Sequence, residues 1–280
     1  MKCHLGFSFL YFTPRVTAEH LPMLGRLRHH GYDGAELPVV DATDAEIAAM
    51  RRELDAEGLA ATAVGFAIEG ANPLDPDPSG RRKAVEHLGR IAEKAAALGA
   101  EVLAGPLHSA YGRFTELPPS SDERAWCAEV LHAAGERAAA CGVTLAIEPL
   151  NRFESYFLNT AKDCAGLVLA VGHPNVTGAL DTHHAHLEES DMLMAIERMG
   201  DTLGHVQLSE NHRGTPGAGQ VDFPAVLDTL DRTGYAGWLV IEAFSRTDPS
   251  FGSALRIWRA LDGGAEEVLA AGAQLVRGFH

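Results

Sequence analysis

The chain has 280 residues, of which 46% are hydrophobic and 22% charged, so it is long enough to bury a large core in one domain. Its formal net charge of −15 repels phosphate groups, which argues against nucleic acid or an anionic membrane as a partner. No apolar run reaches the length of about eighteen residues typical of a membrane span. Residues 1–4 lack the apolar region of a signal peptide, so we expect a cytoplasmic protein.

Glycines recur at the points where a helix should end and a strand begin, at positions 31, 58, 99, 142, 172 and 234. Each interval holds an apolar run followed by an amphipathic stretch. These runs predict strands over residues 4–11, 34–38, 59–66, 101–107, 143–147, 176–181, 203–208 and 238–243.

The helices between these strands carry their own start signals. A helix is expected over residues 17–30, and capping boxes at residues 43–46 and 120–123 begin the second and fourth helices. Eight strand–helix repeats in a chain of this length predict an α/β fold, a closed (β/α)8 TIM barrel formed by residues 1–280 as a single domain. The four cysteines are widely spaced without a C-x-x-C pair, which predicts reduced thiols and neither a zinc site nor a disulfide.

Polar side chains stand near the carboxyl ends of the predicted strands, where parallel barrels gather their catalytic groups. They are Glu36, His108, Glu148, Asp181, Gln207 and Glu242. The last four come from consecutive strands and should share one side of the barrel mouth. Glu36 fits either a support of this site or an ion pair, and His108 is a weaker candidate. His205 faces the same way as Gln207, one layer deeper, and is a substitute ligand.

Three carboxylates that converge in a low-dielectric site repel each other strongly unless a cation lies between them. A divalent metal held by Glu148, Asp181, Gln207 and Glu242 resolves this repulsion. Four oxygen ligands favour Mn²⁺ or Mg²⁺ over Zn²⁺, with Co²⁺ as a substitute. We therefore expect a Mn²⁺ site.

Several segments resemble the ketose 3-epimerases (the D-tagatose and D-allulose 3-epimerase group) of the xylose-isomerase-like sugar isomerase/epimerase barrels. The most specific is the Glu-x-x-Asn-Arg-x-Glu pattern of residues 148–154, followed by Asn159-Thr160. The other matching segments are residues 180–184, 204–206, 210–214 and 240–244, and weaker agreement extends from about residue 31 to residue 264.

The resemblance implies roles for individual residues. Glu148, Asp181 and Glu242 match the metal-binding carboxylates, and Glu148 and Glu242 also match the two acid/base residues. The side chains that match those holding the sugar hydroxyls and carbonyl are Glu154, His184 and Arg213. The resemblance also implies a homodimer or homotetramer. One position departs from the pattern, since Gln207 stands where these epimerases usually supply a histidine ligand.

Epimerisation at C3 of a ketose explains why these groups are needed. A proton beside the carbonyl leaves from one face, and a proton returns to the opposite face, so two carboxylates must flank the carbon. A metal that bridges O2 and O3 stabilises the enediolate. With the resemblance, the sequence therefore predicts an isomerase, a metal-dependent ketose 3-epimerase that inverts C3 of a free ketose.

Three other functions stay open. A hydroxypyruvate-isomerase-like aldose–ketose isomerase, acting on a small or phosphorylated sugar, is favoured by Gln207, because relatives of that type resemble this chain in having glutamine there. An endonuclease IV-type hydrolase shares the barrel, but the net charge of −15 opposes DNA binding. A non-catalytic sugar-binding barrel would not need both Glu148 and Glu242. Arg213 also suits phosphate, although no Gly-rich phosphate cradle follows the last two strands.

Overall fold

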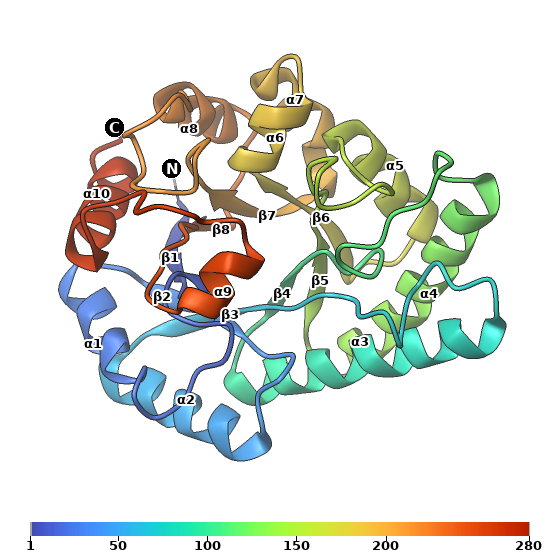
Figure 1. Ribbon diagram of the computed structural model, residues 1–280, viewed down its shortest axis with the longest axis horizontal. Helices are drawn as coiled ribbons and strands as arrows, with labels where there is room; N and C mark the ends of the chain where they lie inside the picture. Colours follow the sequence, from blue (N-terminus) through green and yellow to red (C-terminus); the bar gives the residue numbers. More distant parts are fainter. Residues whose placement is uncertain (1, 280) are drawn as a thin grey trace.

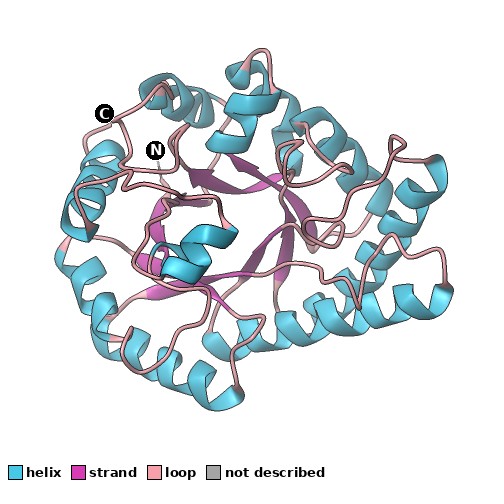
Figure 2. Ribbon diagram, viewed as in Figure 1, coloured by secondary structure: helices cyan, strands magenta, loops and turns pink. Residues whose placement is uncertain are grey.

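The computed structural model describes residues 2–279, which form a closed barrel of eight parallel strands surrounded by helices (Figure 1, Figure 2). The strands follow chain order around the barrel, and β1 pairs with β8 to close it. This confirms the predicted TIM barrel. The strands are β1 His4–Ser8, β2 Gly34–Pro38, β3 Ala60–Val64, β4 Val102–Gly105, β5 Thr144–Ile147, β6 Val176–Asp181, β7 Leu203–Leu208 and β8 Trp238–Ile241.

The helices form the outer layer and begin where the sequence provides caps. Both predicted capping boxes are present, at the starts of α2 and α4. All six glycines expected at helix ends have positive φ. The helices are α1 Pro22–His29, α2 Asp44–Glu57, α3 Pro78–Leu98, α4 Ser121–Ala140, α5 Ala161–Val171, α6 Thr182–Glu188, α7 Met192–Met199, α8 Phe223–Arg232, α9 Pro249–Ala254 and α10 Ala265–Arg277.

Two predicted boundaries near the N-terminus are wrong. The first strand ends at Ser8, because residues 9–11 turn into a 3-10 helix and Phe9 packs edge-on against Phe12. The helix expected from residue 17 begins at Pro22 instead. Proline at the first helical position is favoured because its missing N–H would have no partner there. Three further predicted strands, over residues 59–66, 101–107 and 238–243, are each shorter by a few residues in the structure.

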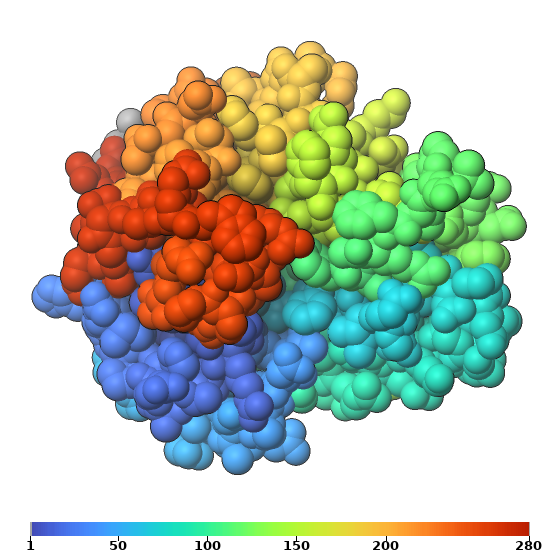
Figure 3. All heavy atoms as spheres, in the orientation of Figure 1, coloured from blue at the N-terminus to red at the C-terminus, as the bar shows by residue number. Residues whose placement is uncertain are grey.

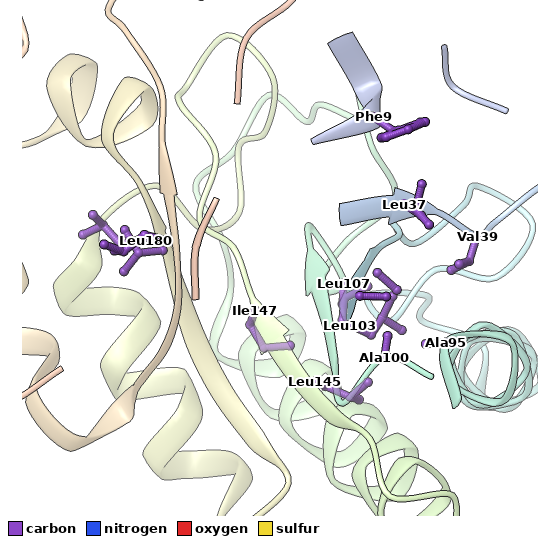
Figure 4. Packing of buried hydrophobic residues seen from close by; sticks show 14 of the residues in the cluster. Phe9, Leu37, Val39, Ala95, Ala100, Leu103, Leu107, Leu145, Ile147 and Leu180 are labelled. Carbon is purple, nitrogen blue, oxygen red and sulfur yellow. The ribbon is translucent and has the colours of Figure 1, made fainter. Parts of the chain in front are cut away.

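The core lies between the strands and the surrounding helices. Figure 4 shows Leu103 grouped with Ala100 and Leu107 on the side of the barrel where α3 carries Ala95. Alanines from β4, β5 and β6 form a separate buried cluster. This leaves room above them for polar side chains at the carboxyl ends of the strands.

The segment after β8 crosses the barrel mouth. In Figure 1, α9 overlies the ring of strands, and in Figure 3 its atoms cover part of that face. Among residues 2–279 no helix combines the length and apolar character needed to cross a membrane. All four cysteines are free, as the sequence predicted.

Candidate active site

Three carboxylates occupy equivalent positions at the ends of neighbouring strands. Glu148 follows β5 directly, and its N–H donates to the carbonyl of Gly105 on β4 at 3.0 Å. Glu242 follows β8 in the same way, with its N–H 3.1 Å from the carbonyl oxygen of Leu208 on β7. Asp181 is the last residue of β6 and caps α6. The parallel ladder thus continues through the residues that carry the carboxylates, and all three side chains are buried.

The three carboxylates are brought together through His184 and Arg213. His184 Nε2 lies 3.4 Å from Glu148 Oε1 and 3.7 Å from Asp181 Oδ2. The Nη1 of Arg213 donates to both Asp181 Oδ2 and Glu242 Oε2. Asp181 therefore shares one partner, His184, with Glu148 and another, Arg213, with Glu242. The three carboxylates belong to one cluster, as expected from their positions at the strand ends.

Arg213 lies where the sequence reasoning expected a cation. Besides the two carboxylates, its Nη1 contacts Ser209 Oγ at 3.1 Å, and its guanidinium lies 4.7 Å from the centre of the Phe244 ring. The residue is only 7% exposed. The resemblance implied a sugar contact for Arg213, which stays a prediction; in this structure its guanidinium contacts the carboxylates.

The loop between β7 and α8 holds Arg213 in this position. Arg213 has a φ of 64°, a left-handed conformation that is uncommon for a residue with a side chain. The loop is stabilised by Glu210, which is fully buried and whose carboxylate accepts backbone N–H groups from Asn211, Gly217, Gln220 and Val221. Glu210 was not among the site residues expected from the sequence. The signal that could have identified it is its position just after a strand, at the start of a glycine-rich loop.

His184 lies between Asn151 and the carboxylates. Its Nδ1 accepts the backbone N–H of Asn151 at 3.0 Å and the Asn151 side-chain amide at 2.9 Å. A nitrogen that accepts a backbone N–H carries no proton, so we assign the proton of the neutral ring to Nε2. That nitrogen faces Glu148 and Asp181, and it also lies 3.0 Å from Nη2 of Arg213. Glu148, Asp181 and His184 offer atoms within 4.8 Å of one another, and Glu154, His183 and His184 form a second such group.

Glu154 lies on the loop after β5, at the edge of the cluster. Its carboxylate accepts from Asn151 Nδ2 at 2.8 Å and from the Tyr111 hydroxyl at 3.3 Å. Asn151 thereby connects Glu154 to His184, a role that the sequence analysis did not assign. Its position within the Glu-x-x-Asn-Arg-x-Glu pattern was the signal that could have identified it.

Gln207 lies on β7 beside the cluster, fully buried. Its side-chain nitrogen donates to Glu242 Oε1 at 3.2 Å and to Glu36 Oε1 at 3.0 Å, whereas its Oε1 has no partner. His205, one layer deeper as expected, contacts Glu36 Oε2 at 2.8 Å. This contact agrees with one of the two roles expected for Glu36, that of a member of an ion pair. The other weaker candidate, His108, stacks on Phe157 and contacts Ser109 Oγ.

Burial and charge divide the three strand-end carboxyls into two kinds. Burial raises the pKa of Glu148 despite His184, and it raises the pKa of Glu242 well above its ordinary value despite Arg213. Burial also acts on Asp181, but there Arg213 and His184 outweigh it, and the pKa is lowered. Asp181 therefore holds its charge most firmly, and the two glutamates take up protons more readily.

The donor set fits a hard divalent cation. Carboxylate oxygens from three strands converge, and the unpartnered Oε1 of Gln207 is a buried carbonyl-type oxygen of the kind that Mn²⁺ and Mg²⁺ bind. A cation would also relieve the repulsion that raises the pKa of Glu242 beside Asp181 and Glu148. The residues present are thus compatible with the metal expected from the sequence.

Comparison with known proteins places this arrangement in a family. The profile of the xylose isomerase-like TIM barrel family matches residues 24–273. The L-ribulose 3-epimerase of Mesorhizobium japonicum is 34% identical over 261 residues, covering 91% of this chain and 86% of that protein. The ketose 3-epimerase of Arthrobacter globiformis is 31% identical over 267 residues, covering 94% and 92%. The crystal structure of a D-allulose 3-epimerase from Methylomonas sp., in complex with D-allulose, superposes with a TM-score of 0.91 at 27% identity, covering 100% of this chain and 98% of that one.

Proposed function

The chain belongs to the xylose isomerase-like TIM barrel family, and from this membership we propose that it is a divalent-metal-dependent ketose 3-epimerase. Relatives that match over most of the chain are named ketose and L-ribulose 3-epimerases, which supports an isomerase-class enzyme acting on ketoses. The observation that carries the proposal is the convergence of Glu148, Asp181 and Glu242 around His184 and Arg213.

In the proposed reaction Glu148 and Glu242 act as the two acid/base groups. They stand on β5 and β8, at opposite ends of the arc formed by four consecutive strands, so a sugar held between them would present one face to each. One carboxylate removes the C3 proton, and the other carboxyl group returns a proton to the opposite face; the reverse reaction exchanges these roles. The raised pKa of both glutamates suits groups that must take up and release a proton.

The remaining residues hold the substrate and the charge. The Nε2–H of His184 can donate to a sugar oxygen beside Glu148, and Glu154 can accept a sugar hydroxyl at the edge of the site. Arg213 can turn from the carboxylates toward the sugar carbonyl. Glu148, Asp181, Glu242 and the Oε1 of Gln207 would hold the metal, Mn²⁺ in the first instance. When bound, that cation supplies a Lewis acid that lowers the energy of negative charge on the sugar oxygens.

We include three finer statements in the proposal. The substrate is an unphosphorylated ketose, because no glycine-rich phosphate cradle at a helix start follows the last two predicted strands. The enzyme works in the cytoplasm, in keeping with four free cysteines. It assembles as a homodimer or homotetramer, which light scattering of the purified protein can test.

The test is proton NMR in D₂O with Mn²⁺ and a panel of five- and six-carbon ketoses. Deuterium that enters at C3, with the appearance of the C3 epimer, is the expected result. The variants Glu148→Gln and Glu242→Gln should each lose formation of the C3 epimer, because one face is left without its acid/base group. Epimer formation that persists in both variants would overturn the assignment of the bases.

An aldose–ketose isomerase of the hydroxypyruvate isomerase type is the second candidate, and Gln207 favours it. In that reaction the proton moves between adjacent carbons on one face, so a single base suffices. The same NMR experiment separates the two activities, because isomerisation places deuterium at C1 of the ketose.

A further inference from the structure

A hydrogen-bonded chain of buried polar residues runs across the barrel, from β2 to β7. Glu36 Oε2 is 2.8 Å from His205 Nε2, and Glu36 Oε1 accepts from Gln207 Nε2 at 3.0 Å. The hydroxyl of Thr62 adds a longer contact to Glu36 Oε2 at 3.4 Å. Glu36, His205 and Gln207 are all 0% exposed. Glu36 therefore has donors at both carboxylate oxygens and is held in one orientation.

The side-chain amide of Gln207 is oriented by this chain. Its nitrogen lies between two carboxylates, 3.0 Å from Glu36 Oε1 and 3.2 Å from Glu242 Oε1. Rotating the amide by half a turn would place its oxygen against both carboxylate oxygens, with no proton between them. The observed orientation leaves Oε1 buried without a partner, which costs about 1–3 kcal/mol for a polar atom. A side chain that retains such a cost is held by stronger contacts elsewhere, and here these are the contacts of its nitrogen with Glu242 and, at the shorter distance, with Glu36. Glu36 is the one of the two carboxylates that is not itself a proposed metal ligand.

We propose that Glu36 is a positioning residue, which selects the oxygen of Gln207 as the atom offered to the divalent cation. The inference rests on the proposed function only for the presence of that cation and is independent of the sugar. His205 acts one step further out, because its contact fixes the Glu36 carboxylate. The two amide atoms of a glutamine differ in chemistry, because the oxygen can bind a cation and the nitrogen can only donate a hydrogen bond. The contacts with Glu36 explain how Gln207 can act as a ligand despite this difference.

The substitution Glu36→Gln tests this directly, since it changes the chemistry of the group with little change of shape. The new amide oxygen would accept from His205, which turns the new NH₂ toward Gln207. Gln207 would then rotate to present its oxygen to residue 36 and its nitrogen to the cation site. We expect Glu36→Gln to weaken Mn²⁺ binding to the metal-free protein by about 10- to 100-fold, the range found when outer-shell partners of metal ligands are changed.

A double-mutant cycle separates positioning from a general structural effect. Calorimetry should follow Mn²⁺ binding to the wild type, Glu36→Gln, Gln207→Leu and the double variant. If Glu36 acts through Gln207, adding Glu36→Gln to Gln207→Leu changes the affinity by less than about twofold. The visible spectrum of the Co²⁺-loaded Glu36→Gln protein should match that of Co²⁺-loaded Gln207→Leu, because both have lost the same ligand. Thr62→Val removes the side-chain hydroxyl that contacts Glu36 and is the matched control, with affinity expected to stay close to wild type.

Three results overturn the proposal: Mn²⁺ affinity unchanged in Glu36→Gln, an equal loss in both backgrounds of the cycle, or a wild-type protein that binds no Mn²⁺. If Glu36→Gln does not fold, Gln207→Leu still decides the matter, since unchanged Mn²⁺ affinity and Co²⁺ spectrum in that variant exclude Gln207 as a ligand. None of these measurements uses a substrate. Failure of the 3-epimerase proposal would instead appear as intact metal binding without exchange at C3 of any ketose.

Discussion

Arg213 should stabilise the metal-free protein by neutralising the carboxylates of the site. Its guanidinium donates to both Asp181 and Glu242, and the residue is only 7% exposed. The substitution Arg213→Met keeps much of the side-chain length and its packing on Phe244, but it removes the charge. Asp181 and Glu242 would then face each other without a cation between them, and the metal-free protein should be less stable.

The magnitude follows from the burial of this group. Removing one partner of a buried ion pair costs about 3–5 kcal/mol, because the other charge stays buried without compensation. For a protein of this size that loss corresponds to a fall in melting temperature of about 6–20 °C.

The loss of stability in Arg213→Met should become smaller as the pH falls. The pKa of Glu242 is raised by burial, so this carboxyl becomes protonated first as the pH falls and then no longer needs the guanidinium. The deficit is therefore largest at alkaline pH and becomes smaller as the pH falls.

Urea unfolding in the presence of a chelator measures this effect. Arg232 provides a matched control, because it also contacts two carboxylates, those of Glu197 and Asp228, but on the surface. Solvent screens such pairs, so Arg232→Met should leave stability close to wild type. Adding Mn²⁺ should restore much of the stability lost in Arg213→Met, since the cation replaces the missing charge. If metal-free Arg213→Met is as stable as the wild type at pH 8, the reasoning about this charge cluster is refuted.

Four further outcomes are expected. Glu148→Gln and Glu242→Gln should each reduce turnover by about 10²- to 10⁴-fold while the far-ultraviolet circular dichroism stays unchanged. Chelation should abolish turnover, and Mn²⁺ at about 100 times its Kd should stabilise the protein by about 2.7 kcal/mol in urea unfolding; no stabilisation would contradict a resident metal. Burial lowers the pKa of His108 to about 3, so the contribution of this histidine to stability should fall by about 1.4 kcal/mol per pH unit as the pH drops below about 6.5, and His108→Leu should lose that component of the pH dependence in the same assay. Metal binding should release protons from Glu148 and Glu242, whose pKa values are raised, and the number released should grow as the pH falls; calorimetry in buffers of different ionisation enthalpy counts them.

The fold could be predicted because its signals are local. Glycines with positive φ end the helices, and capping boxes begin two of them, so each strand–helix unit is visible within about forty residues. The positions of Glu148, Asp181 and Glu242 follow from the same regularity, since the carboxyl ends of parallel strands all lie at the same end of the barrel. The boundary at Ser8 was missed because Phe9 and Phe12 pack on each other, and apolar residues in a run do not reveal where a strand turns.

The contacts of the site depended on features that the chain does not encode locally. The position of Arg213 requires its left-handed backbone and the four backbone N–H groups that Glu210 holds. The contact between Glu36 and His205 joins residues separated by 169 positions, across the centre of the barrel. Sequence patterns predicted which side chains reach the mouth, but the pairing among them is decided by the three-dimensional arrangement of loops and opposite strands.

The balance of buried charge connects these observations. Four buried carboxylates come from β2, β5, β6 and β8, namely Glu36, Glu148, Asp181 and Glu242, and Arg213 is the buried arginine that contacts two of them. If all four carboxylates were ionised, one guanidinium would leave a large excess of negative charge, which a low-dielectric interior does not tolerate. The raised pKa of Glu148 and Glu242 is how the metal-free protein meets this excess, by favouring protons on the two groups. A divalent cation at the proposed site would meet it differently, because it would lower the pKa of both glutamates and so favour their ionised form. In the proposed reaction the ionised form is the one that removes a proton, so the cation would act on Glu148 and Glu242 themselves as well as on the substrate.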